Sequence, residues 1–140
     1  MEDCLFCKII KGEVPCYKIY EDKYTLAFLD ISNDGVGGHT LVLPKIHTQN
    51  IISANQFVLS KVMSTVKKIS RHYIDHCGFD GVNVFNNCNE CAGQSVMHLH
   101  FHIIPRKNND GVNKWDINTV HSMTLEEVCK KLAINNDKNA

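Results

Sequence analysis

Three histidines recur at every second position in one apolar segment, His98-Leu-His-Phe-His102. Such a segment is typical of an extended strand, on which His98, His100 and His102 share one face and the apolar residues between them share the other. We expect the apolar face to be buried and the histidine face to be available for chemistry. Because imidazole can be a nucleophile, a proton donor or a metal ligand, three of them at intervals of about 7 Å form a row that can bind a polyanion.

The loop before the histidines supplies the other groups that a displacement at phosphorus needs. Without a catalytic metal, that reaction needs an in-line nucleophile, donors to the non-bridging oxygens and an acid for the leaving group. Gly93 lets backbone N–H groups approach a phosphate, and Ser95 adds a hydroxyl donor. We expect His100 to be the nucleophile, oriented by the histidines on either side, because a phosphohistidine is labile enough for water to complete the reaction.

Length, charge and cysteine content narrow the class of protein. A chain of 140 residues is the usual size of one domain, so we expect a single domain over residues 1–140. Fifteen Lys and Arg balance fifteen Asp and Glu, which argues against a nucleic acid polymer or a membrane surface as partner and favours a small ligand. The chain shows no leader or membrane-spanning run, and its seven cysteines suit reduced thiols or a metal, so we expect a cytoplasmic protein.

Composition and periodicity predict five short strands and three helices. The strands are expected at 17–20, 25–30, 39–43, 82–85 and 98–104. A short helix at 4–11 should end at Gly12, and a long helix at 53–76 should be capped by Ser53 and closed by Gly78. A last helix near 124–134 begins with a capping box formed by Thr124 and Glu127. This order indicates an α+β fold, a five-stranded antiparallel sheet with its helices on one side.

Several segments resemble one known family. The segment from Gly93 to Arg106, Gly-Gln-Ser-Val-Met-His-Leu-His-Phe-His-Ile-Ile-Pro-Arg, resembles the signature of the histidine-triad (HIT) family. Five further blocks are similar to bacterial-type HIT hydrolases close to the Hint branch, in the same order: Cys4-Leu-Phe-Cys-Lys-Ile-Ile, Tyr20-Glu-Asp, Leu26-Ala-Phe-Leu-Asp-Ile, Gly38-His-Thr-Leu-Val-Leu-Pro-Lys and Ile46-His. The resemblance implies the HIT-like fold, one long helix with short terminal helices, and a variable tail over residues 107–140.

The resemblance also implies catalytic roles. His100 matches the nucleophile that becomes nucleotidylated, and His102 matches the histidine that contacts the phosphate and assists the leaving group. Ser95 and Asn87 match polar residues that hold the α-phosphate and assist proton transfer. His39 matches a histidine behind the triad, which it supports together with His98.

The same resemblance implies a purine nucleotide site. Asp30 matches a carboxylate that accepts hydrogen bonds from the ribose hydroxyls, and Gly93 and Gln94 belong to the nucleotide-binding loop. The apolar slot for the base would be formed by Leu5, Phe6, Ile9, Phe28 and Ile31. Simple core packing explains each of these apolar residues equally well on its own.

Cys4 and Cys7 have the spacing of a zinc knuckle, but two thiolates cannot complete a tetrahedral site. The resemblance implies His47 and His98 as the other two ligands. Such a site would be closed and structural, and catalysis itself would need no metal. A pair of free thiols is the alternative.

Three positions depart from the family pattern. Asn89 stands where many relatives have glycine, and asparagine tolerates the positive φ that such a turn needs. Leu29 stands where the Hint branch has histidine. Cys88 and Cys91 lie in the same loop, and the sequence assigns them no role.

The resulting hypothesis is a hydrolase that cleaves adenosine 5′-phosphoramidates at the α-phosphate through a nucleotidyl-His100 intermediate. A dinucleoside polyphosphate hydrolase is the nearest alternative, and a nucleotidyltransferase is disfavoured because that branch has glutamine at the position of His102. A nucleotide-binding regulator with incidental activity is an alternative from another class. A catalytic metal site on the three histidines lacks a carboxylate base beside it. The resemblance further implies a homodimer with a ten-stranded sheet.

Overall fold

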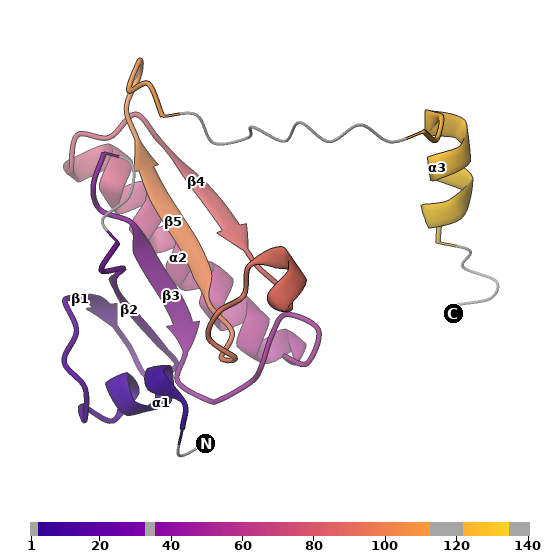
Figure 1. The fold of residues 1–140 in the computed structure, drawn as a ribbon. Coiled ribbons are helices and arrows are strands. Elements are labelled where there is room, and N and C mark those ends of the chain that lie inside the picture. Colours follow the sequence, from indigo (N-terminus) through magenta and orange to yellow (C-terminus); the bar gives the residue numbers. More distant parts are fainter. Residues whose placement is uncertain (1–2, 33–35, 113–121, 135–140) are drawn as a thin grey trace.

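The computed structural model describes residues 3–32, 36–112 and 122–134. Its five strands form one antiparallel sheet in the order β1-β2-β3-β5-β4 (Figure 1). The predicted α+β fold with a five-stranded antiparallel sheet is therefore confirmed. The elements are β1 Lys18–Glu21, β2 Thr25–Leu29, β3 Thr40–Pro44, β4 Gly81–Asn86, β5 Phe101–Arg106, α1 Leu5–Ile10, α2 Gln56–His76, the 3-10 turn η1 Glu90–Ala92 and α3 Leu125–Leu132.

The two faces of the sheet are covered by different helices. The long helix α2 packs on one face, where its residues Val62 and Ile69 join Val42 of β3 and Phe101 of β5 in one buried cluster. On the opposite face, Phe6 of α1 packs with a second cluster. That cluster also contains Leu26, Phe28, Leu41 and Leu43. The prediction that the helices lie on one side is wrong, because alternate residues of β2 and β3 are apolar on both faces and both need cover.

Helix α2 begins three residues later than predicted. The side chain of Asn55 caps it by accepting a hydrogen bond from the N–H of Val58 at 2.9 Å. The predicted cap, Ser53, instead belongs to a turn centred on Asn50, whose Oδ1 accepts from the N–H of Ser53 at 3.1 Å. The C-terminus agrees with the prediction, because Gly78 follows the C-cap with φ of +81°.

The strand at the end of the histidine motif begins three residues later than predicted. Strand β5 begins at Phe101, so of the three histidines only His102 lies in the sheet. The segment before it is held by other bonds, because the N–H of Leu99 donates to the carbonyl of Thr48 at 2.7 Å. The side chains nevertheless alternate, with Leu99 and Phe101 in the cluster beneath α2.

Helix α3 confirms the predicted start, since the hydroxyl of Thr124 accepts from the N–H of Glu127 at 3.2 Å. Figure 1 shows α3 set apart from the sheet. Within the described ranges, no helix combines the length and the apolar character that crossing a bilayer requires.

The α2 face of the sheet provides a direct test of the core. Ile69 is 3% exposed in the cluster beneath α2, whereas Ile74 on the same helix is 42% exposed. We expect Ile69→Ala to lower the free energy of unfolding by about 2–5 kcal/mol, because it leaves a cavity. Ile74→Ala should change it by about 0.5 kcal/mol or less. Urea denaturation measures both, and equal losses would contradict this assignment of the core.

Candidate active site

A row of four side chains crosses the sheet on the α1 face. The strand register places Phe28 of β2, Leu41 of β3, His102 of β5 and Phe85 of β4 opposite one another in turn. The ring of Phe85 stacks on that of His102, with centroids 4.4 Å apart and planes 8° apart. The sheet thereby holds the plane of the His102 imidazole.

His102 also contacts a second histidine. Its Nδ1 lies 2.9 Å from Nε2 of His39, whose ring is buried just before β3. Nε2 of His102 is buried and has no hydrogen-bond partner among the residues that the structure describes. Of the two ring nitrogens of His102, Nε2 is thus left without a partner in this part of the chain, whereas Nδ1 faces His39.

The backbone sets the tautomer of His100. Nδ1 of His100 lies 2.7 Å from the carbonyl oxygen of His98, and a carbonyl only accepts, so this nitrogen carries the proton. Nε2 consequently keeps a lone pair. Burial lowers the pKa of His100 and keeps the ring neutral. A neutral imidazole with an unprotonated Nε2 is the form that a nucleophile requires.

The expectation that the histidine face is open is wrong. His98 is fully buried and His100 is 6% exposed, because Phe6 of α1 packs edge-on against the His100 ring at a centroid distance of 5.0 Å. Helix α1 therefore covers this face, and little of the His100 ring is exposed.

His98 belongs to a different group from the other two triad histidines. Its Nε2 donates to the carbonyl of Pro44 at 2.8 Å, so Nδ1 holds the lone pair. That Nδ1 lies 3.5 Å from Sγ of Cys4 and 3.6 Å from Sγ of Cys7, and Nδ1 of His47 lies 3.3 Å from Sγ of Cys7. The four ligand atoms all lie within 4.8 Å of one another. Two thiols and two imidazoles that converge in this way fit a tetrahedral zinc ion.

The loop before the triad is braced by Gln94. Its side chain accepts from the N–H of Asn89 at 2.8 Å and donates to the carbonyl of Gln49 at 2.7 Å. Asn89 has φ of +76°, which confirms that asparagine tolerates this turn in place of glycine. Because Gln94 is 3% exposed, its side chain supports the loop from inside.

Gly93 is the position in this loop where glycine is required. Its φ is +99°, and a Cβ placed there would lie 3.2 Å from Nδ2 of Asn87. The Asn87 amide therefore packs against the Gly93 backbone, and Ser95, two residues further along the loop, is exposed.

Asp30 lies beside the histidines. Burial alone would raise the pKa of its carboxyl, but hydrogen bonds from Ser32 hold that pKa below its usual value. The ionised carboxylate has Oδ2 3.9 Å from Nε2 of His39. A ligand atom of Asp30, one of His39 and one of His102 all lie within 4.8 Å of one another, so the carboxylate adjoins the two histidines.

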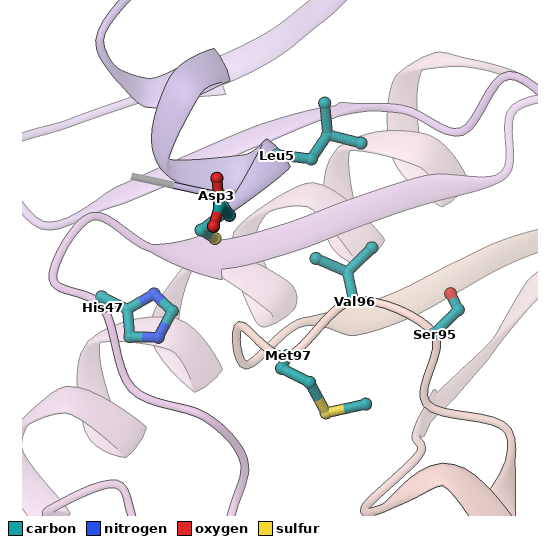
Figure 2. Close-up of a pocket in the computed structure, with 7 residues that line it drawn as sticks. Asp3, Leu5, His47, Ser95, Val96 and Met97 are labelled. Atoms are coloured by element: carbon teal, nitrogen blue, oxygen red, sulfur yellow. The ribbon is translucent and has the colours of Figure 1, made fainter. Parts of the chain in front are cut away.

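The five apolar residues expected around a purine do not form one slot. Ile9, Phe28 and Ile31 line a cavity of about 280 Å³. Leu5 lines another, of about 840 Å³, together with Ser95 (Figure 2). Phe6 packs against the rings of Phe28 and of the triad histidines.

Figure 2 shows the larger cavity between α1 and the loop before the triad. His47 lies at one end and Ser95 at the other, with Val96 and Met97 between them. The cysteine–histidine cluster, through Cys4 and His47, and the loop before the triad, through Ser95, therefore border the same cavity.

Comparisons with known proteins identify the family of this chain. A family model described as HIT domain matches residues 11–109, and the chain belongs to this family. Protein hit of Bacillus subtilis is 49% identical over 105 residues, which are 75% of this chain and 72% of that protein. An adenosine 5′-monophosphoramidase of Schizosaccharomyces pombe is 39% identical, over 76% of this chain and 77% of that protein. The adenylylsulfatase HINT3 of Arabidopsis thaliana is 38% identical, over 93% and 66%.

Solved structures show the same fold. A HIT family protein from Bacillus anthracis superposes with a TM-score of 0.78 at 41% identity, covering 93% of this chain and 92% of that chain. A histidine-triad family protein from Mycobacterium smegmatis, described as Zn-bound, gives a TM-score of 0.75 at 34% identity, covering 80% and 81%. The resemblance drawn from the sequence is therefore confirmed.

Sequence reasoning did not identify Phe85 or the carbonyl of Pro44. Phe85 was predicted only as the last residue of a strand, and the pairing of this strand with β5, which brings Phe85 against His102, is not visible in the sequence. The Pro44 carbonyl left no signal in the sequence, because any residue would supply it.

The buried His102 predicts a dependence of stability on pH. Burial lowers its pKa from 6.5 to about 4, with the nearby His100 and His39 adding to the effect. As the pH falls from 6.5 towards 4, the unfolded chain binds a proton that the folded His102 does not bind, so the free energy of unfolding decreases. We expect His102→Gln to flatten this decrease in urea denaturation, and His72→Gln, at an exposed histidine, to leave it unchanged. Parallel pH profiles for wild type and His102→Gln would contradict the assignment.

Proposed function

We propose that this protein hydrolyses adenosine 5′-phosphoramidates at the α-phosphate through a nucleotidyl intermediate on His100. The hydrogen bond from Nδ1 of His100 to the carbonyl of His98 supports this proposal most directly, because it leaves Nε2 as a lone-pair nucleophile. Relatives named as an adenosine 5′-monophosphoramidase and an adenylylsulfatase support the substrate class.

In the first step, Nε2 of His100 attacks the α-phosphorus. A bond forms between nitrogen and phosphorus, the bond to the leaving amine breaks, and the amine takes a proton delivered through Nε2 of His102. The contact between His102 and His39 at 2.9 Å holds this ring in place, and the Asp30 carboxylate favours its protonated form when a substrate phosphate is near. In the second step, water gives a proton to Nε2 of His102 while its oxygen forms a bond to the same phosphorus, and the bond between that phosphorus and Nε2 of His100 breaks to release AMP.

The other polar residues hold the nucleotide. Asn87, Ser95 and the backbone at Gly93 would donate hydrogen bonds to the non-bridging oxygens as negative charge develops there. The Asp30 carboxylate would accept from the ribose hydroxyls. The cavity that Ile9, Phe28 and Ile31 line would receive the base.

His100→Ala tests the chemical step. We expect hydrolysis of an AMP-lysine amide to fall by about 10³-fold or more, as when other enzymes lose their nucleophile. Wild-type protein quenched during turnover without acid should carry an AMP adduct on His100 in mass spectrometry, and the variant should carry none. His72→Ala, which changes an exposed histidine on α2, is the matched control. Equal rates for His100→Ala and wild type would remove His100 from the mechanism.

The same assay separates the alternative functions. Faster turnover of diadenosine polyphosphates than of AMP amides would identify the dinucleoside polyphosphate hydrolase. Tight AMP binding without turnover of any of these compounds would identify a nucleotide-binding regulator.

We further propose that Cys4, Cys7, His47 and His98 bind a structural zinc ion. The support is the convergence of the four ligand atoms and the tautomer of His98, which presents the lone pair of Nδ1. Zinc here would join α1 to the segment before β5, and the Zn-bound relative from Mycobacterium smegmatis agrees with such a site. The ion would fix the position of His98, and through its carbonyl that of His100, without contacting the substrate.

Zinc content can be measured directly. We expect one equivalent of zinc in wild-type protein by inductively coupled plasma mass spectrometry, and a substoichiometric amount in Cys7→Ser. Cys77→Ser, which removes an exposed cysteine away from the cluster, should keep the wild-type content. A strong chelator should lower the melting temperature of wild type and leave that of Cys7→Ser unchanged. Equal zinc content in Cys7→Ser and wild type would contradict the ligand set.

Two further proposals concern the assembly and the location of the protein. We propose a homodimer in which two sheets join edge to edge, since β4 is an edge strand of the sheet. We also propose a cytoplasmic location, which the seven unpaired cysteines suit.

A further inference from the structure

A third cavity lies where the turn between β1 and β2, the end of β3 and the start of α2 meet. Its volume is about 290 Å³. Pro44, Ile46, Val58 and the rings of Tyr24 and Phe57 make its lining mainly apolar. Ile46 is 63% exposed and Phe57 is 48% exposed, although both are large apolar side chains. An exposed apolar groove of this kind marks a surface that binds another molecule.

Lysines surround this groove. Lys61 of α2 places its Nζ 4.7 Å from the centre of the Tyr24 ring and 5.4 Å from that of Phe57. Lys23 lies 5.5 Å from the same Tyr24 ring, and Lys45 lines the groove from the end of β3. We call this feature the lysine-rimmed groove.

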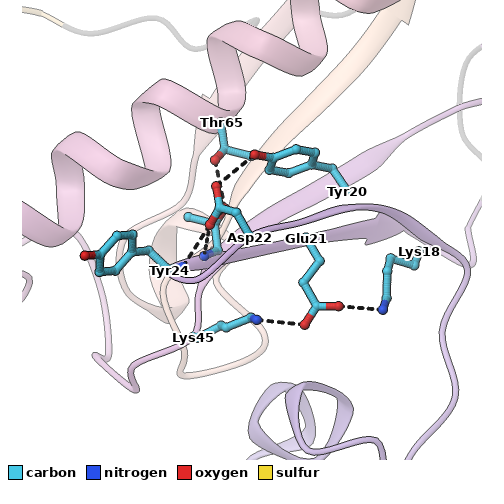
Figure 3. A network of polar contacts seen from close by, with 8 residues as sticks. Lys18, Tyr20, Glu21, Asp22, Tyr24, Lys45 and Thr65 are labelled. Atoms are coloured by element: carbon cyan, nitrogen blue, oxygen red, sulfur yellow. Dashed lines mark hydrogen bonds and ion pairs between the residues drawn. The ribbon is translucent and has the colours of Figure 1, made fainter.

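The charge of the surroundings is positive although the chain as a whole is neutral. From Gln56 to Ile74, α2 carries four basic residues and no Asp or Glu. Two carboxylates adjoin the rim: Asp22, which accepts from Tyr20, Tyr24 and Thr25, and Glu21, which accepts from Lys45 at 2.7 Å and also from Lys18 (Figure 3). One rim lysine therefore already binds a carboxylate, whereas Lys23 and Lys61 contact only aromatic rings in the described interactions.

Tyr24 forms one wall of the groove, and hydrogen bonds and ring packing hold it in place without a ligand. Figure 3 shows Asp22 at the centre of a network in which its Oδ1 accepts from the N–H groups of Tyr24 and Thr25, each at 2.8 Å. Its Oδ2 accepts from the hydroxyl of Tyr20 at 3.0 Å. Tyr24 then packs edge-on against Phe57, with ring centroids 5.3 Å apart. Preorganised aromatic walls reduce the entropy cost of binding.

We propose that the lysine-rimmed groove binds an acidic segment of a partner protein, with one apolar side chain of that segment inserted between Tyr24 and Phe57. Carboxylates on either side of the anchor would pair with Lys23 and Lys61, as Glu21 already pairs with Lys45. An acidic peptide with one apolar anchor suits this lining, because the lysines offer positive charge around two aromatic rings. This site is independent of the proposed hydrolysis.

Selection from a phage library of random dodecapeptides tests the proposal. Wild-type protein is the target, and phage that bind the double variant Phe57→Ala/Lys61→Glu are removed first. We expect the enriched peptides to carry Asp or Glu on both sides of one Leu, Ile, Phe or Trp. No enrichment, or enrichment of peptides without acidic residues, would overturn the proposal.

Affinities of the enriched peptides then identify the residues involved. Fluorescence anisotropy with labelled peptide should show about tenfold weaker binding for Lys61→Glu and for Phe57→Ala, since anchors and close charge pairs dominate such interfaces. Lys67→Glu and Ile74→Ala, at exposed positions of the same helix outside the groove, are matched controls and should bind as wild type does. Circular dichroism confirms that each variant is folded. Equal affinities for all four variants would place the peptide elsewhere and refute the proposal.

Ligands other than an acidic peptide can be distinguished by comparing their binding to wild type and to a groove variant. AMP, an oligonucleotide, vesicles containing phosphatidylserine and the protein itself at high concentration are tested in turn against wild type and Lys61→Glu. Binding of one of these that Lys61→Glu abolishes, without binding of any acidic peptide, would assign the groove to that occupant and overturn the peptide proposal.

Discussion

His98 connects the two parts of the site through three atoms of one residue. Its Nε2 donates to the carbonyl of Pro44 at the end of β3, and its Nδ1 faces the cysteines at the start of α1. Its carbonyl oxygen accepts from Nδ1 of His100 and so selects the tautomer of the proposed nucleophile. A change at the cysteines therefore reaches His100 through one rigid residue. This chain of contacts explains how a buried structural centre can matter for a reaction in which it takes no part.

The positions of the two helices follow from the apolar residues on both faces of the sheet. A helix on the α2 face alone would leave Phe28 and Leu41 exposed, and α1 covers them while bringing Phe6 against His100. Packing that completes the second core therefore also buries the His100 imidazole and lowers its pKa. The contact between Phe6 and His100 thus belongs both to the core and to the proposed nucleophile.

The histidine site and the lysine-rimmed groove present different chemistry. The histidines, Asp30 and the loop around Gly93 offer groups suited to phosphate and ribose. The lysine-rimmed groove lies at the N-terminal end of α2 and offers two aromatic rings with three lysines around them. A chain with a formal net charge of zero can therefore still hold a local field, because its acids and bases are unevenly placed.

The sequence by itself determined the fold class, the family and the approximate helices and strands, because apolar periodicity, capping residues and the triad motif are local signals. It also indicated that Cys4 and Cys7 needed two further ligands. Only the tertiary structure decided that α1 and α2 cover opposite faces, that β5 starts after His100 and that Phe85 stacks on His102. These features depend on strand register and on backbone carbonyls such as that of Pro44, which carry no residue-specific signal, so no local pattern could reveal them.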